Sequence, residues 1–331
     1  MLTQPSFRIR RRLMMAAGIL GSLVIPWSLV HASKSIQQRV AADPQGTVEI
    51  VSVAGAIDIA GWDRPEVEVT GTVGDQVDHV DLNSSNGRVT VHVVASPGAE
   101  FGDKTVARLQ VHVPAKSTIV ARLVSADLKL SSVTGEVKLQ TVSGDINGEV
   151  GGDLSASTVS GDVKLTARNA RSIDIRSASG DIRLTGGGGN VDVNSVSGDI
   201  SLELGNVSRG RLKSVSGDVS ATLTLAPDAQ LEGQTISGDL RFEFTSAPAG
   251  DFDIQSFSGD IDNCFGPKPV ESRYGPGTRL TFRNGEGRAH VSAETKSGDV
   301  RLCVVGQRRG YLRPESAPRV AAEPVRVVYV F

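Results

Sequence analysis

Aromatic residues and cysteine are scarce in this chain of 331 residues: aromatics make up 4% of it, and there are two cysteines. Sugar-cleaving β-helix enzymes line their grooves with aromatic rings, so this scarcity argues against that class. Beyond the first 32 residues the four histidines, His79, His92, His112 and His290, lie far apart with no motif around them. No nucleophile elbow, phosphate loop or zinc spacing is present. The sequence therefore predicts no catalytic residue, no cofactor and no metal centre, and a protein that is not an enzyme.

The first 32 residues are typical of an export signal. Four arginines between Arg8 and Arg12 precede an apolar run from Leu13 to Val30, and small residues follow at a plausible cleavage site. We therefore predict a signal peptide at 1–32 and export to the periplasm or the cell surface. An uncleaved membrane anchor is the alternative, because eighteen apolar residues nearly span a bilayer. The Arg10–Met14 run leaves both the general secretory and the twin-arginine export routes open.

Acidic side chains outnumber basic ones once the signal is removed. The whole chain has 35 Lys and Arg against 37 Asp and Glu, and residues 1–32 hold four of the arginines and no acid. The exported chain therefore has 35 − 4 = 31 basic side chains and a formal charge of 31 − 37 = −6. Such a surface does not attract nucleic acid.

A Ser-Gly-Asp tripeptide followed by Ile, Val or Leu recurs along the second half of the chain. Its glycines step by 17, 19, 18, 19, 21, 21 and 39 residues, and a weaker Thr-Gly-Glu-Val copy has Gly135. The last gap is about two periods, with a degenerate copy around Tyr274–Gly277, Leu280 and Phe282 in its middle. A period near twenty residues indicates stacked units that bury their apolar faces against one another. The predicted turn residues are Gly144, Asp145, Gly161, Asp162, Gly180, Asp181, Gly198, Asp199, Gly217, Asp218, Gly238, Asp239, Gly259, Asp260, Gly298 and Asp299.

Apolar and polar residues alternate on both sides of each glycine, as in Val191–Ser195 and Ile200–Leu204. This alternation predicts two short strands per unit, joined by a sharp turn. In a parallel solenoid, equivalent residues of successive coils stack about 4.8 Å apart. In an antiparallel meander, Gly-Asp would instead be a hairpin turn. Because residue types and not only polarity repeat at fixed offsets, we predict an all-β protein: a parallel β-solenoid with coils of about 19 residues.

Two side-chain columns follow from this stacking. A Ser or Thr lies three residues before most of the glycines, and we expect these hydroxyls to bond one another up and down the stack. The aspartates would form an acidic column, whose repulsion of roughly 0.9 kcal/mol per neighbouring pair is tolerable on a solvated edge. We expect these carboxylates to cap turns. Weak calcium binding is the alternative, with Asp181, Asp199 and Asp218 as the candidates.

The remaining segments flank the repeats. Residues 36–130 alternate without the tripeptide and are expected to form irregular β coils or a cap, followed by the repeat solenoid at 131–305. Residues 306–331 are expected to hold a linker and a C-terminal strand. Cys264 and Cys303 each lie five residues after a repeat glycine. If the degenerate coil separates them, they are two coils apart and too distant to bond, so a disulfide requires that coil to bulge out.

Two hexapeptides, Thr141–Ile146 and Ser195–Ile200, resemble the repeats of the bacterial putative-adhesin domain, a β-strand-repeat family formerly of unknown function. The stretches Phe265–Val270 and Tyr274–Gly277 are similar to a segment near the C-terminal end of such proteins. The resemblance covers roughly residues 45–305. It implies an exported β-solenoid and assigns no binding residues.

These observations predict a non-catalytic repeat protein of the cell envelope or surface, either an adhesin or a structural binding module. Its partner would be a protein or a polysaccharide, and it would touch the membrane only through an uncleaved signal. Two other functions remain open. One is a carbohydrate-active β-helix enzyme, which would show a cleft with clustered carboxylates. The other is a periplasmic scaffold or sensor partner in envelope stress.

Overall fold

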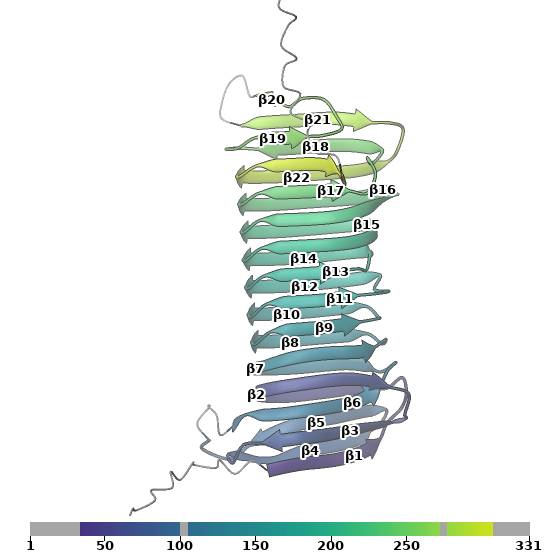
Figure 1. Ribbon diagram of the computed structural model, residues 1–331, viewed down its shortest axis with the longest axis vertical. Coiled ribbons are helices and arrows are strands. Elements are labelled where there is room, and N and C mark those ends of the chain that lie inside the picture. Colours follow the sequence, from purple (N-terminus) through teal and green to yellow (C-terminus); the bar gives the residue numbers. More distant parts are fainter. Residues whose placement is uncertain (1–33, 100–104, 272–276, 307–331) are drawn as a thin grey trace, which may run out of the picture. The chain divides into compact units, whose positions relative to one another are not determined.

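Alternation of polar and apolar residues makes nearly all of the described chain β-strand (Figure 1). The computed structural model describes residues 34–99, 105–271 and 277–306, so the predicted signal at 1–32 and the predicted C-terminal strand lie outside it. Within these ranges every element is a strand, and no helix is long and apolar enough to cross a membrane. The strands are β1 (Lys34–Ala41), β2 (Thr47–Trp62), β3 (Glu66–Val73), β4 (Val77–Ser85), β5 (Arg88–Ala95), β6 (Ala107–Pro114), β7 (Thr118–Val133), β8 (Val137–Ser143), β9 (Ile146–Val150), β10 (Leu154–Ser160), β11 (Val163–Ala167), β12 (Ser172–Ser179), β13 (Ile182–Thr185), β14 (Gly189–Ser197), β15 (Ile200–Ser216), β16 (Val219–Ser237), β17 (Leu240–Phe244), β18 (Gly250–Ser256), β19 (Ile261–Asn263), β20 (Val270–Glu271), β21 (Thr278–Asn284), β22 (Ala289–Ser297) and β23 (Val300–Val304).

The repeats form two faces of parallel strands. Strands that lead into the Ser-Gly-Asp turn make sheet 1, and strands that leave it make sheet 2. In sheet 1, Leu154 pairs with Val137 on one side and with Ile173 on the other, all in parallel register. In sheet 2, Val163 likewise lies between two equivalent residues of neighbouring coils. The predicted parallel solenoid is therefore confirmed, and the hairpin alternative is wrong.

In-register stacking places like side chains over one another inside the protein. Val137, Leu154, Ile173 and Val191 form one such column, and each is at most 2% exposed. Full burial of an aliphatic side chain of this size is worth about 1.5–3 kcal/mol. Each coil contributes residues to several such columns, and these columns hold the two sheets together. This packing explains why apolar residues recur at fixed offsets from each glycine.

Glycine is required at the turn for two reasons. Gly198 has a φ of +123°, and a Cβ built on it would lie 2.4 Å from the carbonyl oxygen of Gly180 in the adjacent coil. Any other residue would meet both the conformational cost and the clash. The weak copy at Gly135 does not make this turn: Gly135 packs against Ser117, whereas Ala126 lies next to Gly144. Gly135 is half a coil from Gly144, so it belongs to the opposite edge.

The N-terminal end of the described chain is stacked out of sequence order. β2 pairs in parallel with β7 on one side, and with β5 and β6 on the other. Beyond these, β4 is antiparallel to β5, and β3 and β1 form antiparallel pairs after β6. β7 crosses the expected boundary at 130 and carries β8 and β9 in the same parallel register as the later coils. The antiparallel strands terminate the parallel stack at this end.

The C-terminal end is also out of sequence order. β22 lies between β16 and β18, and β23 lies between β17 and β19. The coil of Gly298 is therefore inserted between the coils of Gly238 and Gly259. The expected degenerate coil in the middle of the last gap is wrong, because β21 instead pairs antiparallel with β18 at the end of the stack.

This insertion brings the two cysteines together. Cys264 and Cys303 form a disulfide with their Cα atoms 4.8 Å apart. The condition that would have kept them two coils apart does not hold, because no coil separates them and their coils are neighbours. The disulfide links the inserted coil of β22 and β23 to the coil of β18 and β19.

Candidate functional site

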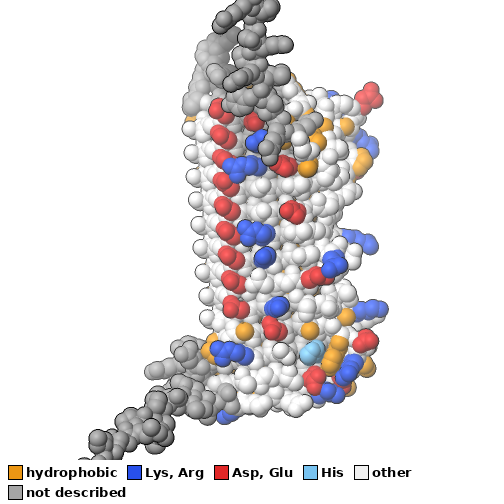
Figure 2. Space-filling view, in the orientation of Figure 1, with side chains coloured by type: hydrophobic (Ala, Val, Ile, Leu, Met, Phe, Trp, Pro, Cys, Tyr) orange, Lys and Arg blue, Asp and Glu red, His pale blue; other side chains and the backbone are white. Residues whose placement is uncertain are grey.

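The repeat aspartates form a continuous column beside the turns, visible as a red line along one edge in Figure 2. Each aspartate except Asp260, the last in the column, accepts a hydrogen bond from the backbone N–H of the aspartate in the next coil. The Asp199 amide donates to Asp181 Oδ1 at 2.9 Å, and the Asp218 amide donates to Asp199 Oδ1 at 2.9 Å. The chain of bonds joins Asp127, Asp145, Asp162, Asp181, Asp199, Asp218, Asp239, Asp299 and Asp260.

This column is a structural device of the turn. One oxygen of each bonded carboxylate accepts an amide of the next coil, and a hydrogen bond to an ionised acceptor is stronger than a neutral one. Asp218 also contacts Arg241 at 3.2 Å, and Asp239 contacts the same guanidinium at 2.6 Å. Calcium binding at Asp181, Asp199 and Asp218 stays a prediction, with one oxygen of each already engaged.

The buried hydroxyls form a second column, just inside the same edge. Its members are at most 6% exposed: Thr141, Thr158, Ser177, Ser195, Ser214, Thr235, Thr295 and Ser256. The expected hydroxyl-to-hydroxyl bonding is wrong, because five of these groups donate to backbone carbonyls instead. The other three, Thr158, Ser195 and Ser214, have no hydrogen-bond partner within the described residues. Ser256 Oγ donates to Gly298 O at 2.9 Å, and Thr295 Oγ1 donates to Gly238 O at 3.1 Å. The column therefore helps to fix the turn and is closed to ligands.

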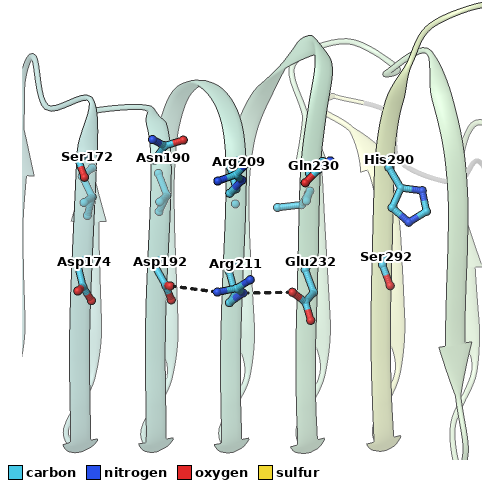
Figure 3. Close-up of a pocket in the computed structure, with 14 residues that line it drawn as sticks. Ser172, Asp174, Asn190, Asp192, Arg209, Arg211, Gln230, Glu232, His290 and Ser292 are labelled. Carbon is cyan, nitrogen blue, oxygen red and sulfur yellow. Dashed lines mark hydrogen bonds and ion pairs between the residues drawn. The ribbon is translucent and has the colours of Figure 1, made fainter.

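A groove of about 810 Å³ lies across sheet 1, over the middle and later coils (Figure 3). Two rows of outward side chains flank it, and the buried residues between them, such as Ile173 and Leu231, turn away into the core. Each row takes one side chain from each of β12, β14, β15, β16 and β22. The first row is Ser172, Asn190, Arg209, Gln230 and His290, and the second is Asp174, Asp192, Arg211, Glu232 and Ser292.

Ion pairs link the second row across the coils. Arg211 lies between two acids, with Nη1 3.6 Å from Asp192 and Nε 3.2 Å from Glu232. Lys213 lies 3.2 Å from the other oxygen of Glu232. Partial burial alone would raise the pKa of Glu232, but hydrogen bonds from Lys213 and Arg211 outweigh it, so the pKa lies below its ordinary value. Glu232 is therefore an ionised anchor for the two cations.

Within the part of the chain that the structure describes, the first row forms no such ion pairs, and it mixes hydrogen-bond donors with acceptors. Asn190 and Gln230 each offer both an amide N–H and a carbonyl oxygen, Ser172 offers a hydroxyl and His290 an imidazole. Because the coils share one pitch, these groups repeat about every 4.8 Å along the groove. The arrangement suits a long polar ligand that lies along the stack and makes similar contacts in each coil.

The histidines do not converge on a site. His290 lies in the groove beside Gln230, whereas His112 stacks on Trp62 with 5.0 Å between ring centroids. His79 lies between Asp78 and Asp81, and a hydrogen bond with Asp78 raises its pKa. Within the described ranges, one group of metal-ligating residue types is close enough to share an ion: Asp262 with the two cysteines, which the disulfide occupies.

The groove residues were not identified from the sequence, although a signal for them exists there. When the repeats are aligned on their glycines, the first row falls eight residues before the glycine, as Asn190 does before Gly198. The second row falls six residues before it, as Asp192 does. The place of His290 and Ser292 beside β16 depends on the inserted coil, which no repeat alignment predicts.

The solved structures that match this chain are very distant from it in sequence. A putative cell adhesion protein from Clostridium sporogenes is 10% identical, covers 82% of this chain and 100% of its own, and has a TM-score of 0.20. A putative adhesin from Bacteroides fragilis is 9% identical, covers 82% and 98%, and has a TM-score of 0.38. A putative adhesin from Parabacteroides merdae is 9% identical, covers 64% and 92%, and has a TM-score of 0.25. No curated protein is significantly similar in sequence.

The family is shown by the sequence itself. Residues 45–250 match the family model described as Toastrack DUF4097. The match includes β2, the repeats from β7 to β16 and nearly all of the groove's outward side chains, with only His290 and Ser292 beyond it. The resemblance to the putative-adhesin repeat family is thereby confirmed, and this chain belongs to the Toastrack DUF4097 family.

Proposed function

We propose that this chain is a non-catalytic binding module, exported to the periplasm or cell surface, that holds a linear envelope polysaccharide along the groove of sheet 1. The main observation in support is that two rows of polar side chains repeat from coil to coil across sheet 1, whose strands are hydrogen-bonded to one another. A sugar polymer offers hydroxyls at regular intervals, and Asn190, Gln230 and His290 can each bond one. The basic N-terminal segment supports export.

A polysaccharide-cleaving enzyme is the rival function, because three carboxylates line the same groove. Asp174 is paired with Arg176 at 2.9 Å, and Asp192 and Glu232 both contact Arg211. A general acid needs a raised pKa to hold its proton at neutral pH. The pKa of Glu232 is shifted in the opposite direction. Pairing of all three with cations favours a rigid binding surface over acid–base chemistry.

Co-sedimentation with purified peptidoglycan tests the proposal. We expect the wild-type protein to sediment with it, and the variant N190A/Q230A/H290A to bind at least about tenfold more weakly. The matched control is K164A/R183A/S201A, three outward residues of sheet 2 in adjacent coils, which should bind as wild type does. Equal losses in both variants would contradict the groove assignment. Release of soluble sugar by wild-type protein would favour the enzyme.

A further inference from the structure

Exposed apolar side chains are concentrated in one column of the stack. Of the nine large hydrophobic residues exposed in the described ranges, seven lie two residues before the alanine or glycine of the turn. Their exposures run from 45% for Val215 to 56% for Ile236. We call this column the apolar stripe, and its members are Val124, Val142, Val159, Val196, Val215, Ile236 and Phe257.

The stripe follows the stack axis through nine successive coils. The serines next to it pair from coil to coil, as Ser160 does with Ser179 and Ser197 with Ser216. Ala178 occupies the stripe position in one coil. Lys296 occupies it in the inserted coil, where it contacts Glu294. The remaining seven coils, from Val124 to Phe257, each present a large apolar side chain at the stripe position.

The fold alone does not require these side chains to be apolar. A β-branched residue suits a strand that enters a turn, but threonine meets that need equally well. The buried column one position earlier alternates freely between Ser and Thr, yet no stripe position carries either residue. A column of exposed apolar side chains of this length is typical of an interaction site.

We propose that the apolar stripe is a self-association surface, where two copies of this chain pack edge to edge along their stacks. The spacing of the side chains along the stripe indicates which kind of partner fits it. Side chains recur about every 4.8 Å along the stripe, but every 5.4 Å per turn along an α-helix and about every 6.8 Å along one face of a strand. A helix would lose half a period against the stripe within about four coils. A second copy has the same period, so its side chains fit between those of the first at every coil.

The length of the stripe sets how wide a stable contact must be. Eight steps of about 4.8 Å give a contact about 38 Å long. A specific protein interface buries about 800 Å² on each partner, so a contact of this length must be about 20 Å wide and must include the residues on both sides of the stripe. The flanking residues fit a polar rim, with the exposed serines on one side and polar side chains such as Arg176, Asn194 and Lys213 on the other.

Sedimentation velocity of the purified protein over a range of concentrations tests this proposal. We expect reversible dimers, and dimerisation at least about 100-fold weaker in V159T/V196T/V215T, because six half-buried valines per dimer become polar. Threonine keeps the branched shape, so far-UV circular dichroism should be unchanged. The control variant K164T/R183T/S201T, on sheet 2, should dimerise as wild type does.

Three results would overturn the proposal. The first is a wild-type protein that stays monomeric at the highest concentrations. The second is a dimer that persists in the stripe variant while its circular dichroism is native. The third is a monomer that binds neutral phosphatidylcholine vesicles through the stripe, since that would make a lipid surface the occupant. Peptidoglycan binding has a separate readout, so failure of the groove proposal would leave this one standing.

Discussion

At the scale of single residues, the side chain of the turn aspartate links its coil to the next one. Its Oδ1 accepts the amide of the next coil, so each carboxylate fixes the coil that follows it. Repulsion along the column opposes this, at about 0.9 kcal/mol per pair in water. A net hydrogen bond to a charged group is worth about 1.5–3 kcal/mol, so the bond exceeds the repulsion.

Substitutions at Asp199 separate the hydrogen bond from the charge. Asp199→Ala removes the acceptor for the Asp218 amide and should lower the free energy of unfolding by about 1 kcal/mol. Asp199→Asn keeps an acceptor oxygen and removes one charge from the column, so its stability should stay within about 0.5 kcal/mol of wild type. Urea denaturation of the three proteins measures both changes. Equal losses of stability in both variants would show that the negative charge of Asp199, and not its hydrogen bond to the Asp218 amide, stabilises the turn.

Glu49 forms ion pairs with residues of two neighbouring strands. Its carboxylate accepts a hydrogen bond from Arg88 at 2.7 Å and also pairs with Arg122, so it joins β2 to strands on both sides. The hydrogen bond from Arg88 is the main cause that holds the pKa of Glu49 below its ordinary value of 4.5. A lowered pKa in the folded state means that the stabilisation is present above 4.5 and is lost as the pH falls further.

The pH dependence of stability should therefore change in Glu49→Gln. We expect wild-type protein to lose part of its stability between pH 5 and pH 3, and the variant to lose less over that interval because it has no proton to take up there. The difference should be modest, since the ion pairs are partly solvated. Urea midpoints at several pH values give the two slopes. Parallel slopes would mean that Glu49 does not contribute.

At the scale of elements, the inserted coil is the feature that sequence order does not predict. The apolar columns of β18 fit against β22, and those of β16 also fit against β22. Every coil presents nearly the same columns, so β18 could stack directly on β16 with similar burial. The structure instead places the last complete repeat between them, and the disulfide fixes it to one neighbour.

Engineered cysteines distinguish these two orders. In a Cys264→Ser, Cys303→Ser background, Ser237→Cys with Ser297→Cys should form a disulfide on mild oxidation, because the two serines pair in adjacent strands. Ser237→Cys with Ser258→Cys should remain reduced, because the inserted coil separates them. Mass spectrometry after thiol blocking reads both outcomes. A bond in the second pair alone would show that the coils stack in sequence order.

At the scale of the whole molecule, the sequence predicts the repeated part well and the ends poorly. Glycine spacing and period-two alternation are local signals, and they specify the turn, the two strands and the parallel stacking. The position of a coil in the stack depends on which coils meet, and columns that are nearly identical cannot encode it. For the same reason the neighbouring positions of Cys264 and Cys303 were missed.

The candidate groove was missed for a related reason. Its rows combine residues of different chemistry, from Asn190 to His290, so they do not appear as a motif. Alignment of the repeats on their glycines gives the positions of both rows, but only the true order of the coils places His290 beside Gln230. The turns with a Ser-Gly-Asp tripeptide are visible in the sequence because glycine and aspartate recur at each of them, whereas the turn at Ala126 and Asp127, which lacks the glycine, was missed.

A distance across several coils tests in-register parallel stacking most directly. Spin labels on Ser143→Cys and Ser237→Cys are separated by five coil steps, through Ser160, Ser179, Ser197 and Ser216. At about 4.8 Å per coil, we predict a backbone separation of about 24 Å by double electron–electron resonance. An antiparallel meander would place two strands in the same sheet for each repeat and give about 48 Å. The longer distance would contradict the parallel stack and, with it, the groove and the apolar stripe.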